Sequence, residues 1–132
     1  MSAAVLAADG GGSKTDVALL AGDGRLLASV RTRGASFHPS DHDRSVATLT
    51  EAVHRAAREA GLPNGEPVAQ VGAFCLAGAD LPVDERRMLR ALRSTGLVEQ
   101  VLLRNDTFAV LRAGTEQGWG ISVVCGTGSN CG

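Results

Sequence analysis

Three short strand-like segments joined by two glycine loops open the chain, and they restrict its fold more than any other feature. The segments cover residues 3–9, 15–21 and 25–32, and the loops between them read GGGSK and GDG. Glycine accepts the positive φ angles of tight turns, and Asp-Gly between apolar runs is typical of a β-hairpin. The amino-terminal part therefore predicts three consecutive antiparallel strands.

Helices and strands alternate after this trio. Helices are expected at 41–60, where Asp41 or Asp43 is the cap, at 82–95 and at 106–114, and strands at 68–78, 97–106 and 118–126. Gly61 and Gly96 end the first two helices. Strands joined by helical crossovers pair in parallel. The order predicts an α/β fold with a mixed five-stranded sheet and helices on both faces, with the last strand outside it.

Charge and hydropathy exclude several classes of partner. The formal net charge is -1, so no overall field attracts nucleic acid or an anionic membrane. The amino terminus lacks a basic segment, and no apolar run reaches the length of a membrane span. We therefore expect a cytoplasmic protein without a nucleic-acid or membrane partner. The sequence leaves open whether it forms a homodimer.

The first glycine loop, DGGGSKT at residues 9–15, differs from the two common nucleotide-binding glycine loops. A P-loop and a dinucleotide fingerprint both lead into a helix, whereas this loop leads into a strand with Ser13 before Lys14. Consecutive backbone N–H groups between two strands can nevertheless bind phosphate, with hydroxyl and ammonium groups as further donors. The alternative is a hairpin whose glycines only permit the turn.

A second glycine loop, CGTGSNCG at residues 125–132, follows an apolar segment in the same way. It also combines small residues with hydroxyl donors. Two such loops, each leaving a strand, could hold a polyphosphate from both sides. The alternative is a flexible end of the chain.

Asp106 lies where the strand at 97–106 gives way to a helix. Sheets of this type place ligand-facing residues at that position. Asn105 and Asp106 are also good helix N-caps, so capping alone could explain them. Beside two phosphate loops, however, an aspartate at a strand end is what phosphoryl transfer to a hydroxyl would use as its general base.

Four motifs in this order resemble one known family: DGGGSKTDVALL, LAGAD, NDTFAVLRAG and CGTGSNCG. They resemble the amino-terminal lobe of the N-acetylglucosamine kinase branch of the BadF/BadG/BcrA/BcrD ATPase family. That family belongs to the actin, Hsp70 and sugar-kinase superfamily, so the resemblance implies a ribonuclease H-like, actin-like ATPase lobe. It also implies an ATP- and Mg2+-dependent kinase that phosphorylates the primary hydroxyl of an amino sugar, a small-molecule partner.

The resemblance implies a role for each matching residue. Asp9 would orient water on Mg2+, and Asp106 would be the catalytic base that also contacts the sugar. The residues implied to contact the nucleotide phosphates are Gly11, Gly12, Ser13, Lys14, Thr15, Gly126, Thr127 and Gly128. Those implied on the sugar side are His38, Asp80, Ser129 and Asn130. Asp80 has an alternative role as a cap of the second helix.

Two departures from the family pattern stand out. Phe37 precedes His38 where the kinases carry asparagine, so recognition of an N-acetyl group is in question. The family also continues into a second lobe. The resemblance therefore implies a boundary between an amino-terminal lobe at 1–116 and the start of the second lobe at 117–132. The expected strand at 118–126 would lack its sheet partners, and such a fragment would be inactive alone because one lobe cannot exclude water.

Three other readings remain open. The same family includes ATPases that activate 2-hydroxyacyl-CoA dehydratases or benzoyl-CoA reductase, which need cluster-binding cysteines, and Cys125 and Cys131 flank the second loop. A non-catalytic nucleotide or sugar sensor would have no use for a base. A two-metal nuclease needs a carboxylate cluster, which Asp9, Asp80 and Asp106 could imitate.

Overall fold

The computed structural model describes residues 2–65, 67–126 and 128–132. Its elements are β1 (Ala3–Gly10), β2 (Lys14–Leu20), β3 (Leu26–Arg33), η1 (Pro39–Asp41), α1 (His42–Glu59), β4 (Ala69–Leu76), α2 (Pro82–Thr95), β5 (Val98–Asn105), α3 (Thr107–Gly114), β6 (Val123–Cys125) and β7 (Ser129–Cys131). Among the described residues, no helix is both long and apolar enough to cross a membrane.

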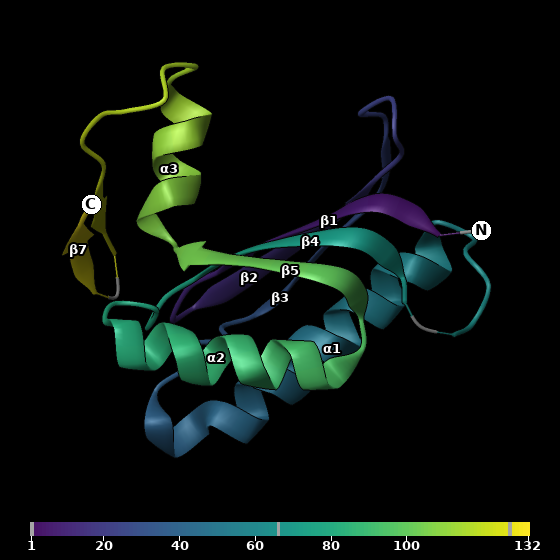
Figure 1. Cartoon of the computed structure of the whole chain (residues 1–132), viewed down its shortest axis with the longest axis horizontal. Coiled ribbons are helices and arrows are strands. Elements are labelled where there is room, and N and C mark those ends of the chain that lie inside the picture. Colours follow the sequence, from purple (N-terminus) through teal and green to yellow (C-terminus); the bar gives the residue numbers. More distant parts are fainter. Residues whose placement is uncertain (1, 66, 127) are drawn as a thin grey trace.

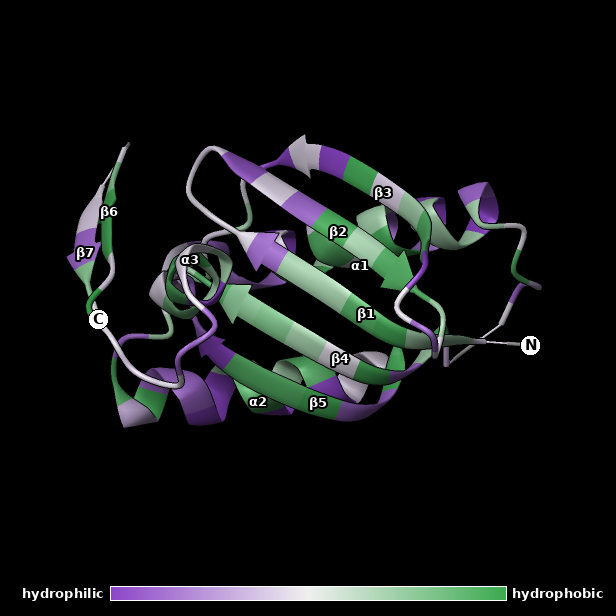
Figure 2. Ribbon diagram, turned by 90° about the horizontal axis from the view of Figure 1, so that it is seen from above, coloured by the Kyte–Doolittle hydropathy of each residue, from purple (hydrophilic) through white to green (hydrophobic). Residues whose placement is uncertain are grey.

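A five-stranded sheet in the order β3-β2-β1-β4-β5 forms the centre of the fold (Figure 2). β1 pairs antiparallel with β2, and β2 with β3, whereas β4 lies parallel to both β1 and β5. The predicted hairpin trio and parallel crossovers are confirmed. The parallel register places Gly10 beside Leu76, and Leu76 beside Asn105. The carboxyl ends of β1, β4 and β5 therefore meet at one edge.

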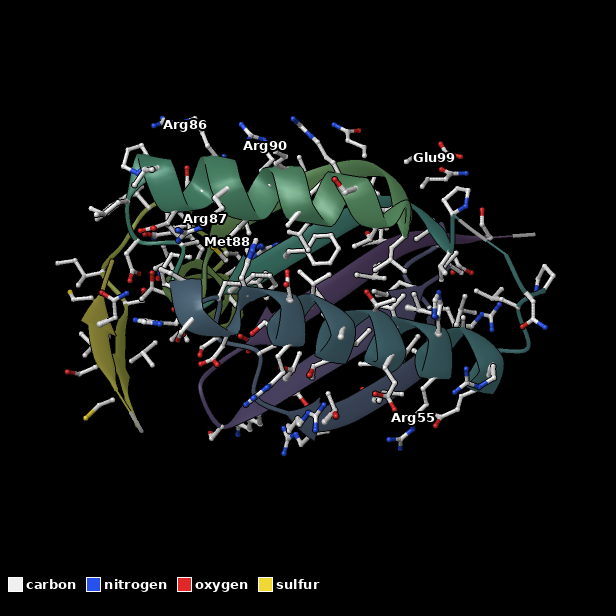
Figure 3. All side chains as sticks on the ribbon, turned by 90° about the horizontal axis from the view of Figure 1, so that it is seen from below. Arg55, Arg86, Arg87, Met88, Arg90 and Glu99 are labelled. Carbon is white, nitrogen blue, oxygen red and sulfur yellow. The ribbon has the colours of Figure 1, made fainter. Side chains whose placement is uncertain are left out.

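Helices lie on both sides of this sheet (Figure 1). α1 and α2 run along one face, and α3 stands on the other side at the end of β5. The core fills the layer between the sheet and the first two helices, where Leu6, Phe74 and Met88 are almost completely buried. Met88 points inward from α2, while Arg86 and Arg90 on the same helix point into solvent (Figure 3). Arg86 and Arg90 are four residues apart and therefore share the exposed face of the helix, while Met88 lies on the buried face, as the period of an amphipathic helix predicts.

The predicted turn residues adopt the conformations that their roles require. Gly24 has φ +85 in the β2–β3 turn and donates its N–H to the carbonyl of Ala21 over 2.9 Å. Gly61 and Gly96 have φ +70 and +69 just beyond the carboxyl ends of α1 and α2. Only glycine reaches this left-handed region without a steric cost, so these positions fix the ends of both helices.

The end of the chain differs from its prediction. Instead of one strand at 118–126, the structure has β6, which pairs antiparallel with β7 in a separate two-stranded sheet. The expectation of a strand without sheet partners was therefore wrong. The second glycine loop reverses the chain, so the residues that follow it supply the missing partner. The boundary between 1–116 and 117–132 stays a prediction.

Candidate functional site

A cavity of about 730 Å3 opens where the carboxyl ends of β1 and β5 meet the β6–β7 hairpin. It collects residues that are more than 100 positions apart in sequence. The described residues that line it are Asp9, Gly11, Gly12, Ser13, Lys14, Asp16, Ser36, Ala77, Gly78, Asp80, Asp106, Val110, Val124, Cys125, Gly126, Gly128, Ser129 and Asn130. Both glycine loops and Asp106 therefore face the same space.

The first glycine loop is held tightly in place. The N–H of Gly11 donates to the carbonyl of Lys14 over 2.9 Å and closes the turn between β1 and β2. The carbonyl of Gly11 accepts from the N–H of Ala35 over 3.1 Å. Gly34 packs so closely that a Cβ there would lie 2.2 Å from the carbonyl oxygen of Gly12. The loop is thus a fixed backbone structure, as a preformed anion-binding nest requires.

Thr15 does not reach this cavity. Its side chain is completely buried with Val17 on the inner face of β2, and its hydroxyl has no hydrogen-bond partner among the residues that the structure describes. Successive side chains of a strand point to opposite faces, so Thr15 turns away when Lys14 and Asp16 face the cavity. The structure therefore does not bring the Thr15 side chain to the cavity, and its implied contact with a phosphate stays a prediction.

The second glycine loop is attached to α3 and to the edge of the sheet. Ser122, just before β6, donates from its buried hydroxyl to the carbonyl of Thr107 over 2.8 Å. Asn130 donates from Nδ2 to Oδ1 of Asp80 over 3.2 Å. These contacts hold Gly126 and Gly128 at the cavity. Thr127 lies outside the described residues.

Asp106 is half-buried at the start of α3 and, within the described part of the chain, makes no side-chain capping hydrogen bond. Burial raises the pKa of its carboxyl above the ordinary aspartate value, and the charge of Asp80 adds to this effect. The backbone N–H groups of Asp106 and Thr107 act in the opposite direction on the same pKa. A carboxylate with a raised pKa is a better proton acceptor than an ordinary one.

The neighbouring carboxylates Asp9 and Asp16 titrate in opposite directions. Burial raises the pKa of Asp9, and the charges of Asp106 and Asp16 add to this effect. The pKa of Asp16 is lowered, chiefly by its hydrogen bond with Arg31, whose Nε lies 2.6 Å from Oδ1. Asp16 is therefore a stable anion, whereas Asp9 bears a charge that the site disfavours.

The pKa of Asp9 predicts a gain in stability when its charge is removed. A raised pKa in the folded state means that ionised Asp9 destabilises the fold above that pKa. We expect Asp9→Asn to raise Tm at pH 7, with the difference vanishing as pH falls below the pKa of the unfolded chain. Asp16→Asn, the matched control with a lowered pKa, should lower Tm at pH 7. A lower Tm for Asp9→Asn in thermal unfolding would contradict this electrostatic account.

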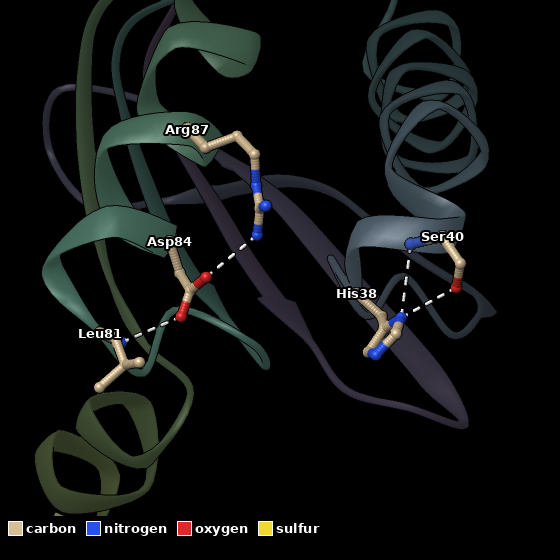
Figure 4. A network of polar contacts seen from close by, with 5 residues as sticks. All are labelled: His38, Ser40, Leu81, Asp84 and Arg87. Carbon is tan, nitrogen blue, oxygen red and sulfur yellow. Dashed lines mark hydrogen bonds and ion pairs between the residues drawn. The ribbon is translucent and has the colours of Figure 1, made fainter.

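Asp80 faces the cavity and does not cap α2. Its Oδ1 accepts from Nδ2 of Asn105 over 2.6 Å. The capping carboxylate of α2 belongs to Asp84, whose Oδ2 accepts from the N–H of Leu81 over 3.3 Å and whose Oδ1 accepts from Arg87 over 3.0 Å (Figure 4). The capping alternative for Asp80 is therefore wrong.

His38 is exposed and does not line the cavity. Its Nδ1 lies 2.8 Å from the hydroxyl of Ser40 and accepts from the N–H of Ser40 over 3.4 Å, at the start of η1 (Figure 4). The side chain of His38 therefore caps η1. Pro39 begins this short helix, and the N–H groups of its first turn need acceptors from outside the helix. His38, for which the resemblance implies a sugar contact, is thus not among the lining residues of the cavity, whereas Ser36 from the same loop is.

Sequence reasoning missed several residues of the cavity. Asp16 follows Lys14 by two positions, so the period of a strand could have placed both on one face. Gly78 has φ +93 and lies in the turn after β4, at the same edge as Asp106. Ser36 and Val110 carry no signal in the sequence that would distinguish them from ordinary loop and helix residues.

The two cysteines that flank the second loop, Cys125 and Cys131, are both exposed. Cys125 lines the cavity, and both lie on the paired strands β6 and β7. Within the described residues, no three His, Cys, Asp or Glu side chains are grouped so that they could hold a metal ion.

Comparison with known sequences identifies sugar kinases. No protein-family model matches the chain. It is 30% identical over 129 residues to the N-acetylmuramic acid/N-acetylglucosamine kinase of Clostridium acetobutylicum, covering 96% of this chain and 41% of that protein. It is 25% identical over 127 residues to the N-acetyl-D-glucosamine kinase of Dictyostelium discoideum, covering 91% of this chain and 40% of that protein. The chain thus spans about two fifths of the length of these relatives.

Solved structures that share this fold are also described as sugar kinases. A candidate N-acetylglucosamine kinase from Chromobacterium violaceum matches with a TM-score of 0.77 at 24% identity, over 98% of this chain and 44% of that one. The ROK hexokinase of Thermus thermophilus matches with a TM-score of 0.58 at 25% identity, over 97% and 44%. The chain therefore has the α/β fold found in the matching part of these sugar kinases, and its relatives by sequence are sugar kinases.

Proposed function

We propose that the protein is a carbohydrate kinase that transfers the terminal phosphoryl group of ATP to the primary hydroxyl of an amino sugar, such as glucosamine or N-acetylglucosamine. The 132 residues would form the amino-terminal lobe of the N-acetylglucosamine kinase branch of the BadF/BadG/BcrA/BcrD family. One observation carries the proposal: both glycine loops and a carboxylate with a raised pKa line a single cavity. Phosphoryl transfer to a hydroxyl needs these parts together.

In this proposal Asp106 is the catalytic base. Its carboxylate is free of capping hydrogen bonds and faces the cavity, so it can accept the proton of the sugar hydroxyl as that oxygen attacks phosphorus. The ammonium of Lys14 would hold the phosphate oxygens from one side, together with the N–H groups of the first glycine loop other than that of Gly11, which already donates to the carbonyl of Lys14. Gly126 and Gly128 would approach from the other side. Catalysis would then depend on positioning and on the charge around the phosphates.

The charges of the cavity fit a nucleotide that brings a divalent cation. Four carboxylates line it, while Lys14 is the only cationic side chain among its described lining residues. A bare polyphosphate would be repelled, so bound Mg2+ would supply the compensating positive charge. Mg2+ in kinases is commonly held by one or two carboxylates, waters and the phosphates, not by a protein cage. Asp9, through water, is the residue that we assign to it.

The sugar would lie on the side of the cavity formed by Asp80, Ser129 and Asn130. Asp80 and Asn130 already share a hydrogen bond, so they form one polar wall next to Asp106. Such a wall offers carboxylate and amide groups to sugar hydroxyls. Because His38 lies outside the cavity, it is not part of the site that we propose.

The proposal predicts sugar-dependent release of ADP by the full gene product. ATP, Mg2+ and either glucosamine or N-acetylglucosamine would be supplied, and ADP formation followed with a coupled assay. We expect turnover that depends on both sugar and Mg2+, and a product phosphorylated at the primary hydroxyl by NMR. Sugar-independent ATP hydrolysis, together with an iron–sulfur chromophore after anaerobic purification, would favour the dehydratase-activator reading instead. Nucleotide binding without turnover would favour a sensor.

A further inference from the structure

Asn105, the last residue of β5, forms more side-chain hydrogen bonds than any other assigned residue that the structure describes. It is 8% exposed and lies between Asp80, Asn130 and the first residue of α3. A buried carboxamide with all of its hydrogen-bonding groups occupied has a fixed orientation. Asn105 is therefore a rigid part of the structure directly next to Asp106.

One end of this carboxamide replaces Asp106 in capping α3. Oδ1 of Asn105 accepts from the backbone N–H of Thr107 over 3.1 Å and from its hydroxyl over 2.8 Å. Asp106 occupies the N-cap position with helical backbone angles, φ -62 and ψ -24, instead of the extended conformation typical of a capping residue. Within the described residues, the carboxylate of Asp106 thus makes no side-chain capping hydrogen bond, although the backbone N–H groups of Asp106 and Thr107 still lower its pKa.

The other end of the carboxamide orients the polar wall formed by Asp80 and Asn130. Nδ2 of Asn105 donates to Oδ1 of Asp80 over 2.6 Å, and Nδ2 of Asn130 donates to the same oxygen over 3.2 Å. Nδ2 of Asn130 also donates to Oδ1 of Asn105 over 3.3 Å. One amide therefore joins the loop after β4, the start of α3 and the second glycine loop.

We propose that Asn105 is a positioning residue, which takes over the capping of α3 so that the carboxylate of Asp106 stays directed into the cavity, and which fixes Asp80 and Asn130 beside it. The importance of this role for catalysis rests on the proposed kinase function. The capping of α3 by Asn105 in place of Asp106 does not depend on that function. Without the Asn105 acceptor, the first turn of α3 has an unpaired N–H, and Asp106 is the next side chain able to accept from it.

The proposal predicts opposite shifts of the Asp106 pKa in two variants. In Asn105→Ala, Asp106 turns to cap the helix, and hydrogen bonds to its ionised form lower its titration midpoint by about one pH unit. Asn105→Asp retains an acceptor for Thr107 and adds a negative charge, so the midpoint rises. Both are measured by carbon-13 NMR titration of the aspartate carboxyls, with Asp106→Asn identifying the signal. Asn64→Ala and Asn64→Asp, in an exposed turn, are matched controls without a shift.

Each outcome decides the proposal. An Asp106 midpoint in Asn105→Ala that equals that of the wild type overturns it, because mere proximity would leave the capping unchanged. If Asn105→Ala does not fold, Asn105→Leu keeps the branched shape and the number of side-chain heavy atoms without an acceptor, and the same fall is expected. In an active kinase, the acid limb of kcat/KM moves with the midpoint and kcat falls by about 10- to 100-fold in Asn105→Ala. A wild type without kinase activity refutes the proposed function, while the NMR titration still decides the role of Asn105.

Discussion

Replacing Asp106 by asparagine is expected to lower kcat by about 10²- to 10⁴-fold. Asparagine has the same shape but accepts no proton at neutral pH, so only the base is removed. Nucleotide binding should persist, because the glycine loops that line the cavity are unaffected. Steady-state kinetics with sugar and ATP measure kcat, and calorimetry with magnesium ADP measures nucleotide affinity. A loss confined to kcat is the signature of an interaction used only in the transition state.

The matched control for this variant is Asp43→Asn, which makes the same chemical change at an exposed position in the first turn of α1. It should leave kcat unchanged. Full activity of Asp106→Asn would remove the base from the mechanism. It would leave Asp106 with no role beyond the structure of α3.

Adding one methyl group at Gly34 is expected to displace the first glycine loop. The new Cβ would lie 2.2 Å from the carbonyl oxygen of Gly12 and 2.5 Å from its carbonyl carbon, and backbone atoms cannot rotate aside as a side chain can. We expect Gly34→Ala to lower the free energy of unfolding by about 1–3 kcal/mol, the range of overpacking in a tight contact. Affinity for magnesium ATP should fall at the same time, because the loop N–H groups lose their positions.

Gly114→Ala is the control for this second variant. Apart from its chain neighbours and its own helix backbone, an added Cβ at Gly114 would meet no heavy atom of the described residues within 4 Å, and the φ of Gly114 is not positive. Urea unfolding and calorimetry should show nearly wild-type behaviour for this control. If Gly34→Ala keeps both wild-type stability and wild-type nucleotide affinity, the first glycine loop is not the fixed phosphate-binding structure that we describe.

The main features of the fold could be predicted because local signals are strong in this chain. Asp-Gly at 23–24 fixes a hairpin, and Gly61 and Gly96 end helices through conformations that other residues adopt at a cost. The β6–β7 hairpin could not be predicted in the same way. Its strands have three residues each, so neither carries a readable pattern, and its turn is formed by the glycines that we assign to phosphate.

The candidate site was only partly predictable, for a related reason. The first glycine loop and Asp106 follow β1 and β5, whose parallel relation to β4 brings their carboxyl ends to one edge. The second glycine loop lies in the separate β6–β7 hairpin, which contacts of Ser122 and Asn130 hold at the same edge. Thr15 and His38 are not among the described residues that line the cavity, which could not be predicted because a motif does not say which way each side chain points. The strand alternation turns Thr15 inward, and a local cap occupies His38. The role of Asn105 follows only from hydrogen bonds to segments 25 residues away on either side.

The most direct test is a crystal structure of the protein with magnesium, a non-hydrolysable ATP analogue and an amino sugar. We predict that the terminal phosphate lies between Gly12 and Gly126, within hydrogen-bond distance of the first-loop N–H groups. The primary hydroxyl of the sugar should lie between that phosphate and the carboxylate of Asp106. A nucleotide bound elsewhere, or a sugar whose hydroxyl points away from Asp106, would contradict the shared cavity on which the kinase assignment depends.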